Sequence, residues 1–308
     1  MVIRRRRDTW DVLIIGGGIA GLTAAQHCAR RGLATALLES TIGFGGLVAT
    51  VNQLDDWPAT GEVSGVALGA ALAEQVRALG VEITQQPARA LKPGDPLQIE
   101  IEGKTLKSRR VIVASGARLR TLGVPGEETL RGKGVSQCAD CDGGFFKDQD
   151  VVVVGGGDAA LQEALLLART CRTVHVVVRG TLCARRAYVD RAASTSNIKF
   201  MWDSAVDAVL GEQAVSGVTL RNIKSGAQSE LECSGVFPFV GPQPNVEFLP
   251  PDIARSESGC VSTDAQYRTS LPAVYAVGAV RAGYCGDLVA AAGEAASASA
   301  EIDRELNT

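Results

Sequence analysis

Cys138 and Cys141 are separated by two residues and are followed directly by Asp142. Two thiols at this spacing close a small disulfide ring when the backbone turns, and such pairs often have a lowered thiol pKa. Asp142 can take up or release a proton during thiol exchange, as general acid–base catalysis requires. The competing interpretations are half of a zinc site and a buried cysteine pair. The pattern favours a redox-active dithiol.

The rest of the cysteine and histidine inventory argues against a metal site. A zinc site would need a shell made mostly of thiolates, and no second Cys-x-x-Cys exists. The remaining cysteines are scattered, unlike the disulfide framework of a secreted protein. We therefore expect no metal and a cytoplasmic protein. The residues concerned are Cys28, Cys171, Cys183, Cys233, Cys260 and Cys285, with His27 and His175 the only histidines.

A glycine loop near the start of the chain has the spacing of a dinucleotide-binding fingerprint. Gly16 allows a tight turn, Gly18 lets a pyrophosphate approach the backbone, and Gly21 lets a helix pack closely on a strand. The start of that helix attracts phosphate. Glu39 stands 21 residues after Gly18, where a carboxylate can accept a hydrogen bond from a ribose hydroxyl. The loop predicts dinucleotide binding rather than a plain packing turn.

A second glycine loop repeats this pattern with one important difference. Gly155 and Gly157 match the first two glycines, and Ala160 takes the third position. The residue equivalent to Glu39 in this second copy is Val178, which cannot bind a ribose 2′-hydroxyl. The usual recognition of NADH is therefore missing from the second loop.

Arginines follow the second loop and indicate a different nucleotide. Arg179 comes directly after Val178, and Arg185 and Arg186 lie in the next loop. A guanidinium group binds a 2′-phosphate well. We therefore expect NADPH rather than NADH if the site binds a nicotinamide; the alternative is a fold that persists around an empty site.

The two loops imply two copies of a strand–helix–strand unit within one chain. The fold class predicted is α/β, with two Rossmann-like, three-layer dinucleotide-binding domains, the second inserted into the first. We expect a helix over 66–79, strand-like alternation over 81–113, a three-strand meander over 205–240 with 215–220 and 234–240 clearest, a short buried strand over 274–277, and a closing helix over about 290–306. The repeated units begin with strands at 11–15 and 150–154.

Composition and charge exclude several classes of protein. The chain has 308 residues, a net charge of −3 and 5% aromatic residues, so no global field or stacking surface favours nucleic acid. No apolar run approaches the roughly 20 residues that span a bilayer. The basic stretch Arg4–Arg7 is interpreted as a solvated tail, because glycines interrupt the apolar run after it too early for a signal peptide.

Several segments together resemble the low-molecular-weight thioredoxin reductase family. Residues 132–143, which contain both close cysteines and Asp142, run into 151–168 as the redox motif runs into the second nucleotide loop in that family. Residues 111–117 with 122–127 resemble its crossover between domains, residues 235–245 its return crossover, and residues 276–280 the segment that closes its FAD site. The match covers nearly the whole chain.

The resemblance implies an FAD-dependent, homodimeric enzyme that reduces a thioredoxin-like protein or a small disulfide. It implies an FAD-binding domain at 1–117 and 243–308, and an NADPH-type domain at 118–242 that carries the cysteines. Cys141 would face the flavin and Cys138 would attack the substrate. The implied FAD-binding residues are Gly16, Gly18, Gly21, Glu39, Gly46, Leu47, Asn52, Ala114, Ser115, Gly116, Gly278, Ala279 and Asp287, and the implied NADPH-binding residues are Gly155, Gly157, Ala160, Arg179 and Arg185.

The departures from the family pattern concern both cofactors. Ala279 stands where the family has an aspartate. The family's Arg-Gln falls at Gly286–Asp287 when aligned on Ala292 and Gly293, or at Cys285–Gly286 when aligned on Tyr284. In the NADPH segment one arginine is replaced by Gly180, and Arg185 is shifted by one position. The family's Gly-Gly-Gln-Leu is shortened to Gly45-Gly46-Leu47.

These departures leave alternatives open. One is a relative that does not use NADPH, either a ferredoxin-dependent thioredoxin reductase or an oxygen-dependent oxidase of small dithiols. Another is a flavin-binding redox sensor without turnover.

Overall fold

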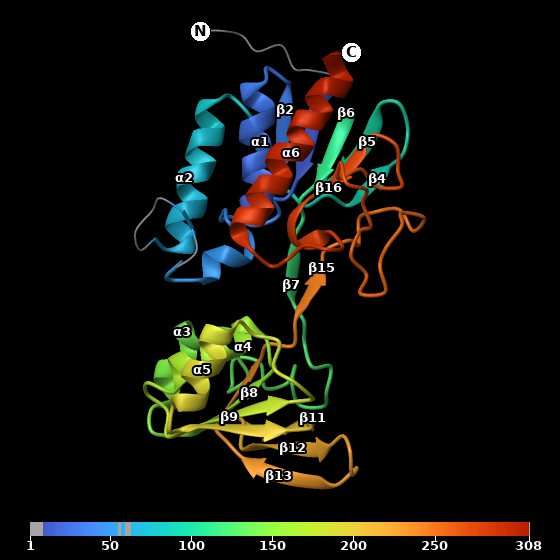
Figure 1. Ribbon diagram of the computed structural model, residues 1–308. Helices are drawn as coiled ribbons and strands as arrows, with labels where there is room; N and C mark the ends of the chain where they lie inside the picture. Colours follow the sequence, from blue (N-terminus) through green and yellow to red (C-terminus); the bar gives the residue numbers. More distant parts are fainter. Residues whose placement is uncertain (1–8, 55–56, 59–62, 308) are drawn as a thin grey trace. The chain divides into compact units, whose positions relative to one another are not determined.

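A computed structural model describes residues 9–54, 57–58 and 63–307 (Figure 1). The basic stretch Arg4–Arg7 lies outside these residues. The chain divides into two compact units, Met1–Arg118 with Gln243–Thr308, and Leu119–Pro242. No helix among the described residues is both long and apolar enough to cross a membrane.

The first unit is built on a seven-stranded sheet in the order β3-β2-β1-β6-β5-β4, with β16 also paired to β6. The pairs among β1, β2, β3, β6 and β16 are parallel, whereas β4, β5 and β6 pair antiparallel. The strands are β1 (Trp10–Ile15), β2 (Thr35–Leu38), β3 (Glu82–Thr84), β4 (Ala90–Lys92), β5 (Leu97–Ile101), β6 (Lys104–Val113) and β16 (Val274–Ala276).

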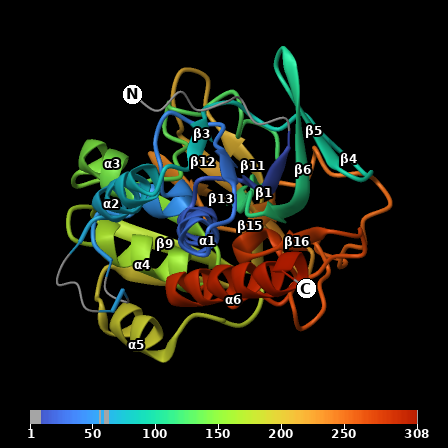
Figure 2. The ribbon, with the colours of Figure 1, turned by 90° about the horizontal axis from the view of Figure 1, so that it is seen from above.

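Three helices cover one face of this sheet, and α1 lies between the other two (Figure 2). They are α1 (Ile19–Arg30), α2 (Gly65–Ala78) and α6 (Leu288–Asn307). Buried alanines on α1 and α6, such as Ala24 and Ala298, allow these two helices to pack closely. On the other face, apolar side chains of the central strands pack with those of β4, β5 and the segment that contains Val246 and Leu249. Both faces of the central strands are therefore buried, which explains their continuous apolar sequence.

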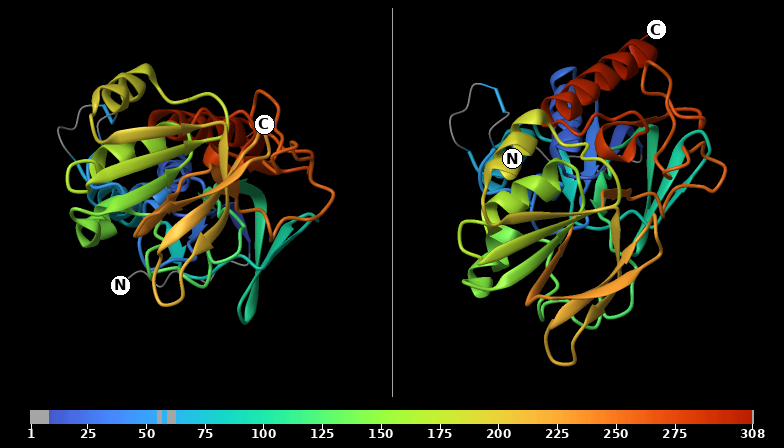
Figure 3. Two further views of the ribbon diagram at one scale, coloured as in Figure 1. Left: turned by 90° about the horizontal axis from the view of Figure 1, so that it is seen from below. Right: turned by 60° about the horizontal axis from the view of Figure 1, so that its bottom comes forward.

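The second unit has three layers. A parallel sheet in the order β10-β9-β8-β14 forms the middle layer, with α4 and α5 on one face and an antiparallel meander on the other (Figure 3). The elements are α3 (Ala139–Asp142), η2 (Gly143–Phe146), β8 (Asp150–Val154), α4 (Asp158–Leu167), β9 (Thr173–Val178), α5 (Arg186–Ser194), β10 (Ile198–Trp202), β11 (Ser204–Leu210), β12 (Gly217–Asn222), β13 (Gln228–Glu232) and β14 (Gly235–Pro238).

The structure corrects the expected meander over 205–240. Its third strand is β13, and the apolar segment within 234–240 instead forms β14, which pairs parallel with β8. All four residues of β14 are buried, whereas β13 is largely exposed. A short apolar run buried on both faces belongs in a parallel sheet, while alternating polar residues suit a half-exposed meander.

Two short strands mark where the chain passes between the units. These are β7 (Ala117–Leu119) and β15 (Pro242–Pro244), and they pair with each other. Beside them, the hydroxyl of Ser115 donates to the carbonyl oxygen of Asn245 at 2.7 Å, and the Asn245 amide donates to the Ser115 carbonyl oxygen at 2.9 Å. Both passages of the chain are thus joined at the edge of the first unit.

Candidate functional site

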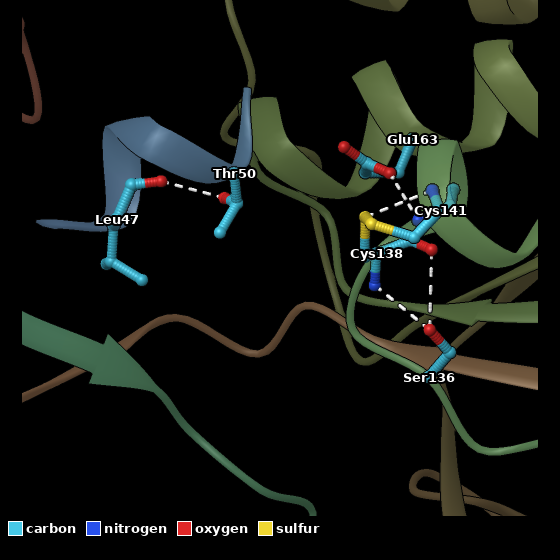
Figure 4. Close-up of a disulfide and its surroundings, with 7 residues drawn as sticks. Leu47, Thr50, Ser136, Cys138, Cys141 and Glu163 are labelled. Atoms are coloured by element: carbon cyan, nitrogen blue, oxygen red, sulfur yellow. Dashed lines mark hydrogen bonds between the residues drawn. A yellow bond between two sulfur atoms is a disulfide. The ribbon is translucent and has the colours of Figure 1, made fainter. Parts of the chain in front are cut away.

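Cys138 and Cys141 form a disulfide, with their Cα atoms 5.3 Å apart (Figure 4). Cys138 is the residue that caps α3, and Cys141 lies within this one-turn helix. The backbone amide of Cys141 donates to the Sγ atom of Cys138 at 3.1 Å, and the amide of Asp142 donates to the Cys138 carbonyl oxygen at 3.1 Å. The turn predicted from the two-residue spacing is therefore a helical turn.

Ser136 holds the chain that enters this turn. Its hydroxyl accepts a hydrogen bond from the Cys138 amide at 3.1 Å and donates to the Cys138 carbonyl oxygen at 3.3 Å. Cys141 is exposed, whereas Cys138 and Asp142 are half-buried. The Asp142 side chain takes part in none of the hydrogen bonds and ion pairs found among the described residues. Its carboxyl group is therefore not committed to a structural contact there.

Glu163 is a site residue that the sequence analysis missed. It lies on α4, and its Oε2 atom accepts a hydrogen bond from the backbone amide of Ala139 at 2.9 Å. Burial raises the pKa of the Glu163 carboxyl; the bond from Ala139 lowers it, and the neighbouring Asp140 carboxylate raises it. Position 163 falls at helical spacing from the buried Ala160 and Leu167. A lone acid on an apolar helix face was the available signal.

The first glycine loop has the open shape that a pyrophosphate requires. Gly16 has φ +112°, and a Cβ atom there would lie 2.2 Å from the carbonyl oxygen of Ala114. At Gly21 an added Cβ would lie 1.8 Å from the Gly16 carbonyl oxygen, so the glycine allows α1 to pack on β1. At Gly18, by contrast, the nearest atom would be the Gly45 carbonyl oxygen at 3.9 Å. Space therefore remains beside Gly18 after the loop has closed on itself.

Glu39 is held next to this loop at the end of β2. It is only 7% exposed, its Oε2 atom accepts from the Gly17 amide at 2.5 Å, and its Oε1 atom accepts from the Thr41 amide at 2.7 Å. A carboxylate oxygen can accept two bonds, so Oε2 can also accept one from a ribose hydroxyl. The start of α1 has no side-chain cap and no acidic residue, which leaves its amides for an anion. These residues fit the adenosine and pyrophosphate parts of FAD.

The segment that the sequence analysis expects to close the FAD site is anchored by an acid of α6. Ala279 lies in the short helix η3 (Gly278–Val280) and offers no carboxylate. The amide of Gly278 donates instead to Oε2 of Glu294, a buried residue of α6, at 2.7 Å. Glu294 also forms an ion pair with Arg281. Glu294 is thus a second acid that sequence reasoning did not single out.

The remaining predicted FAD residues have different structural settings. Ala114 and Gly278 contact the glycine loop region: an added Cβ at Gly278 would lie 3.0 Å from Ala20 of α1. Asp287 instead accepts hydrogen bonds from the amides of Val289 and Ala290 at 2.8 and 3.2 Å, which caps α6. Gly46 and Leu47 begin the short helix η1 (Gly46–Thr50). Leu47 and Asn52 are exposed. Gly116 follows Ser115 and has φ +62°.

The second glycine loop is formed as predicted from its repeat of the first. Gly155 has φ +141°, and a Cβ there would lie 2.2 Å from the Phe239 carbonyl oxygen. Ala160 is completely buried in the core of the unit. Val178 is buried at the end of β9. Val178 thus takes the position at the strand end that Glu39 has in the first unit, as the repeat of the two loops predicts.

The segment after Val178 folds back onto this loop. The amide of Cys183 donates to the Gly156 carbonyl oxygen at 2.9 Å. Arg185 donates to the two carboxylate oxygens of Asp158, from its backbone amide and from Nε, both at 2.6 Å. Arg179 and Gly180 are exposed beside this segment. The structure therefore brings Arg185 to the start of α4 but engages it with an internal acid.

Comparison with known proteins identifies the family. Residues 10–297 match the pyridine nucleotide-disulphide oxidoreductase family. Thioredoxin reductase of Treponema pallidum is 36% identical over 293 residues, which cover 94% of this chain and 95% of that protein. Thioredoxin reductase of Lactococcus lactis, solved in the FR conformation, superposes with a TM-score of 0.90 at 35% identity, over 96% of this chain and 98% of that one.

A third comparison gives the same result at lower identity. T. acidophilum thioredoxin reductase superposes with a TM-score of 0.89 at 29% identity and covers 98% of this chain and 100% of that chain. The resemblance and the fold class inferred from the sequence are both confirmed. The chain belongs to the pyridine nucleotide-disulphide oxidoreductase family, as a relative of the low-molecular-weight thioredoxin reductases, and is an FAD-dependent disulfide oxidoreductase.

Proposed function

We propose that Cys138 and Cys141 are the redox pair through which this enzyme reduces its substrate disulfide. The observation that carries the proposal is the closed disulfide on a helical turn, with the Cys141 amide directed at the Cys138 sulfur. Two electrons and two protons convert this disulfide to two thiols. Cys138 then attacks a sulfur of the substrate, and Cys141 displaces the substrate, which leaves as a dithiol.

The order of the two roles is supported by hydrogen bonding. An amide that donates to sulfur favours the thiolate over the thiol. The Cys141 amide occupies this position relative to Cys138. Cys138 is therefore the attacking thiolate and Cys141 the thiol that receives electrons from the flavin. Asp142 exchanges the protons that these steps require.

The two glycine loops indicate which nucleotide each unit binds. We assign FAD binding to residues 1–117 and 243–308, through the open space at Gly18, the carboxylate of Glu39 and the other residues named above for this cofactor. Bound FAD supplies two-electron chemistry to the disulfide. Residues 118–242 form the NADPH-type domain, with Gly155, Gly157 and Ala160 in its loop and Arg179 as the exposed cation beside it.

NADPH is the proposed electron donor, but a weakly bound one. Val178 removes selectivity for NADH, while Gly180 removes one of the cations expected near a 2′-phosphate. Arg185 is bound to Asp158 and so is not free to bind the 2′-phosphate. Asp158 itself is a carboxylate at the start of α4, where the pyrophosphate would lie. This contact favours a second candidate, in which ferredoxin or a small dithiol replaces NADPH as the reductant.

The proposed partner is a thioredoxin-like protein. The names of the relatives support this partner, and so does Phe145, which is 79% exposed four residues after Cys141 and offers an apolar contact to a protein surface. We further propose a homodimer in the cytoplasm, where the six cysteines outside the disulfide would stay reduced.

The test is an anaerobic titration of the yellow protein with NADPH. The expected result is loss of the flavin absorbance with about two equivalents of NADPH per site, one for the flavin and one for the Cys138–Cys141 disulfide, followed by reduction of added thioredoxin. A flavin that stays oxidised with NADPH and NADH but is bleached by reduced ferredoxin or by a small dithiol would establish the second candidate. A flavin that is bleached but never passes electrons to any disulfide would contradict the role of the cysteine pair.

A further inference from the structure

The carboxylate of Glu163 reaches the turn that carries both redox cysteines. Its Oε2 atom accepts from the amide of Ala139, the residue directly after Cys138, across 24 positions in the sequence. Ala139 is the first residue of α3. The first amides of a helix have no partner within the helix. Glu163 therefore satisfies an amide that a one-turn helix cannot satisfy by itself.

The other bonds at this turn come from the segment itself. Ser136 binds the backbone of Cys138, and the amides of Cys141 and Asp142 bind Cys138. The Glu163 bond instead joins the cysteine-bearing helix to α4, a ten-residue helix packed in the core of the second unit. Figure 4 shows the Glu163 side chain directed at the turn. The position of α3 thus depends on a contact with a rigid neighbour.

The charged residues that lie on α3 and α4 are all acidic. The other charged residue of α4 is Asp158 at its start, so the helix supplies no cation. The charged residues of α3 are Asp140 and Asp142, both acidic. Glu163 is half-buried, so its charge is screened less than that of a surface carboxylate. Glu163 binds the amide of the residue directly after Cys138, and no basic residue of these two helices offsets its charge when a thiolate forms at Cys138.

We propose that Glu163 is a positioning residue of the redox pair: its hydrogen bond to Ala139 holds α3 in place, and its negative charge opposes ionisation of Cys138. The inference rests on the proposed roles of the two cysteines. Reduction breaks the Cys138–Cys141 bond with two electrons from the reduced flavin and two protons from solvent. Cys138 must then lose its proton before it attacks, and Glu163 sets how readily this happens.

Two variants separate the hydrogen bond from the charge. Glu163→Gln keeps an oxygen that accepts from Ala139 and removes the charge, whereas Glu163→Ala removes both. Glu212→Gln is the matched control, because Glu212 is an exposed residue in the turn between β11 and β12. Each protein is reduced with a phosphine, and alkylation of Cys138 by iodoacetamide is followed by peptide mass spectrometry from pH 6 to 9. Fragmentation of the peptide distinguishes Cys138 from the exposed Cys141, and peptide analysis keeps the exposed Cys183 and Cys285 out of the measurement.

The expected result follows from the behaviour of thiols. Removal of a like charge close to a thiol increases the thiolate fraction about tenfold, while each thiolate becomes about threefold less nucleophilic. Alkylation of Cys138 at pH 7 should therefore accelerate about threefold in Glu163→Gln, with its pH profile shifted to lower pH. Reduction of the disulfide by the flavin should stay within twofold of wild type in Glu163→Gln and slow about tenfold in Glu163→Ala.

The contrary outcomes are distinct. Wild-type alkylation in Glu163→Gln would overturn the role of the charge, and equal slowing of disulfide reduction in both variants would overturn the role of the hydrogen bond. If Glu163→Ala does not fold, alkylation of Glu163→Gln still decides the first point, and the rate of disulfide reduction in Ala139→Pro, which removes the donor of the same bond at the first position of α3, decides the second. A wild-type disulfide that stays closed when the flavin is reduced would overturn the proposed redox pair itself, together with this inference.

Discussion

Arg185 and Asp158 are joined by two hydrogen bonds, from the backbone amide and the Nε atom of Arg185 to the two carboxylate oxygens of Asp158, each 2.6 Å long. Asp158 is the first residue of α4, directly after the second glycine loop. In a dinucleotide-binding unit this position lies at the helix end that attracts the pyrophosphate. The contrast with α1, whose first turn contains no acidic residue, suggests that the two loops differ in their affinity for phosphate.

A first prediction concerns the nucleotide at this second loop. Gly180→Arg should strengthen NADPH binding and leave NADH binding unchanged, because the new guanidinium binds only the 2′-phosphate. A hydrogen bond between charged groups contributes about 1.5–3 kcal/mol, so the gain should be about 10- to 150-fold. Gly180 is exposed and has no atom within 4 Å of an added Cβ, so a side chain at this position starts in open space.

Equilibrium dialysis with the oxidised enzyme measures both nucleotides under one condition. Gly144→Arg provides the control, because Gly144 also has open space around it but lies next to the redox helix rather than at the nucleotide loop. Equal improvement for NADPH and NADH in Gly180→Arg would contradict selective recognition of the 2′-phosphate. Tight and fast NADPH reduction of the wild type would contradict the proposed weak site.

The second prediction concerns the first loop. Gly18→Val should fold normally but bind FAD about 5- to 150-fold more weakly, the range expected when a side chain overfills a packed site by 1–3 kcal/mol. Gly18 has φ −74° and ψ −176°, which valine adopts readily, and its added Cβ meets nothing closer than 3.9 Å in the protein. The loss should therefore reflect the cofactor alone.

Flavin content and thermal unfolding of the apoprotein provide the two measurements. Gly43→Val, at a glycine with open space on the loop after β2, should retain FAD. Gly21→Val should lose the fold together with FAD, because its added Cβ would lie 1.8 Å from the Gly16 carbonyl oxygen. A Gly18→Val variant that retains its full FAD content would contradict the assignment of the pyrophosphate to this loop.

The third prediction separates the roles of the two cysteines. Cys138→Ser should leave the Cys141 thiolate beside the flavin and produce a long-wavelength charge-transfer band. Cys141→Ser should lose electron flow from the flavin to the cysteine pair and show no such band. Absorbance spectra from 500 to 700 nm decide the matter, with Cys260→Ser, which changes a free cysteine elsewhere in the chain, as the control. A band in Cys141→Ser alone would reverse the two roles.

The fourth prediction concerns proton transfer. Asp142→Asn should slow exchange with the substrate disulfide about 100-fold, at the lower end of what general acid–base catalysis contributes, while reduction of the flavin stays within about twofold. Rapid-mixing kinetics resolve the two half-reactions. Asp148→Asn is the control, because Asp148 is exposed in the same segment with φ 57°, a conformation that asparagine also adopts. Equal slowing of both half-reactions would argue against a proton-transfer role for Asp142.

The sequence by itself determined the two Rossmann-like units and the close cysteine pair. Each strand–glycine loop–helix unit is a continuous stretch whose apolar residues and glycines have fixed spacing, as from Asp11 to Gly21 and from Asp150 to Ala160. The cysteine pair is likewise local, since two residues separate Cys138 from Cys141. Patterns of this length reflect backbone geometry that neighbouring residues impose on one another, so they can be recognised without the rest of the chain.

Only the tertiary structure decided which distant residues meet. The segment within 234–240 joined the parallel sheet as β14 because β8, about 85 positions earlier, offered a buried edge. Glu163 reaches Ala139 across 24 positions, and Arg185 reaches Asp158 across 27. Side-chain bonds of this kind depend on how distant segments pack together, and the spacing of neighbouring residues does not predict that packing. Packing therefore decided that Glu163 binds the turn with the two cysteines and that Arg185 binds Asp158 beside the second glycine loop.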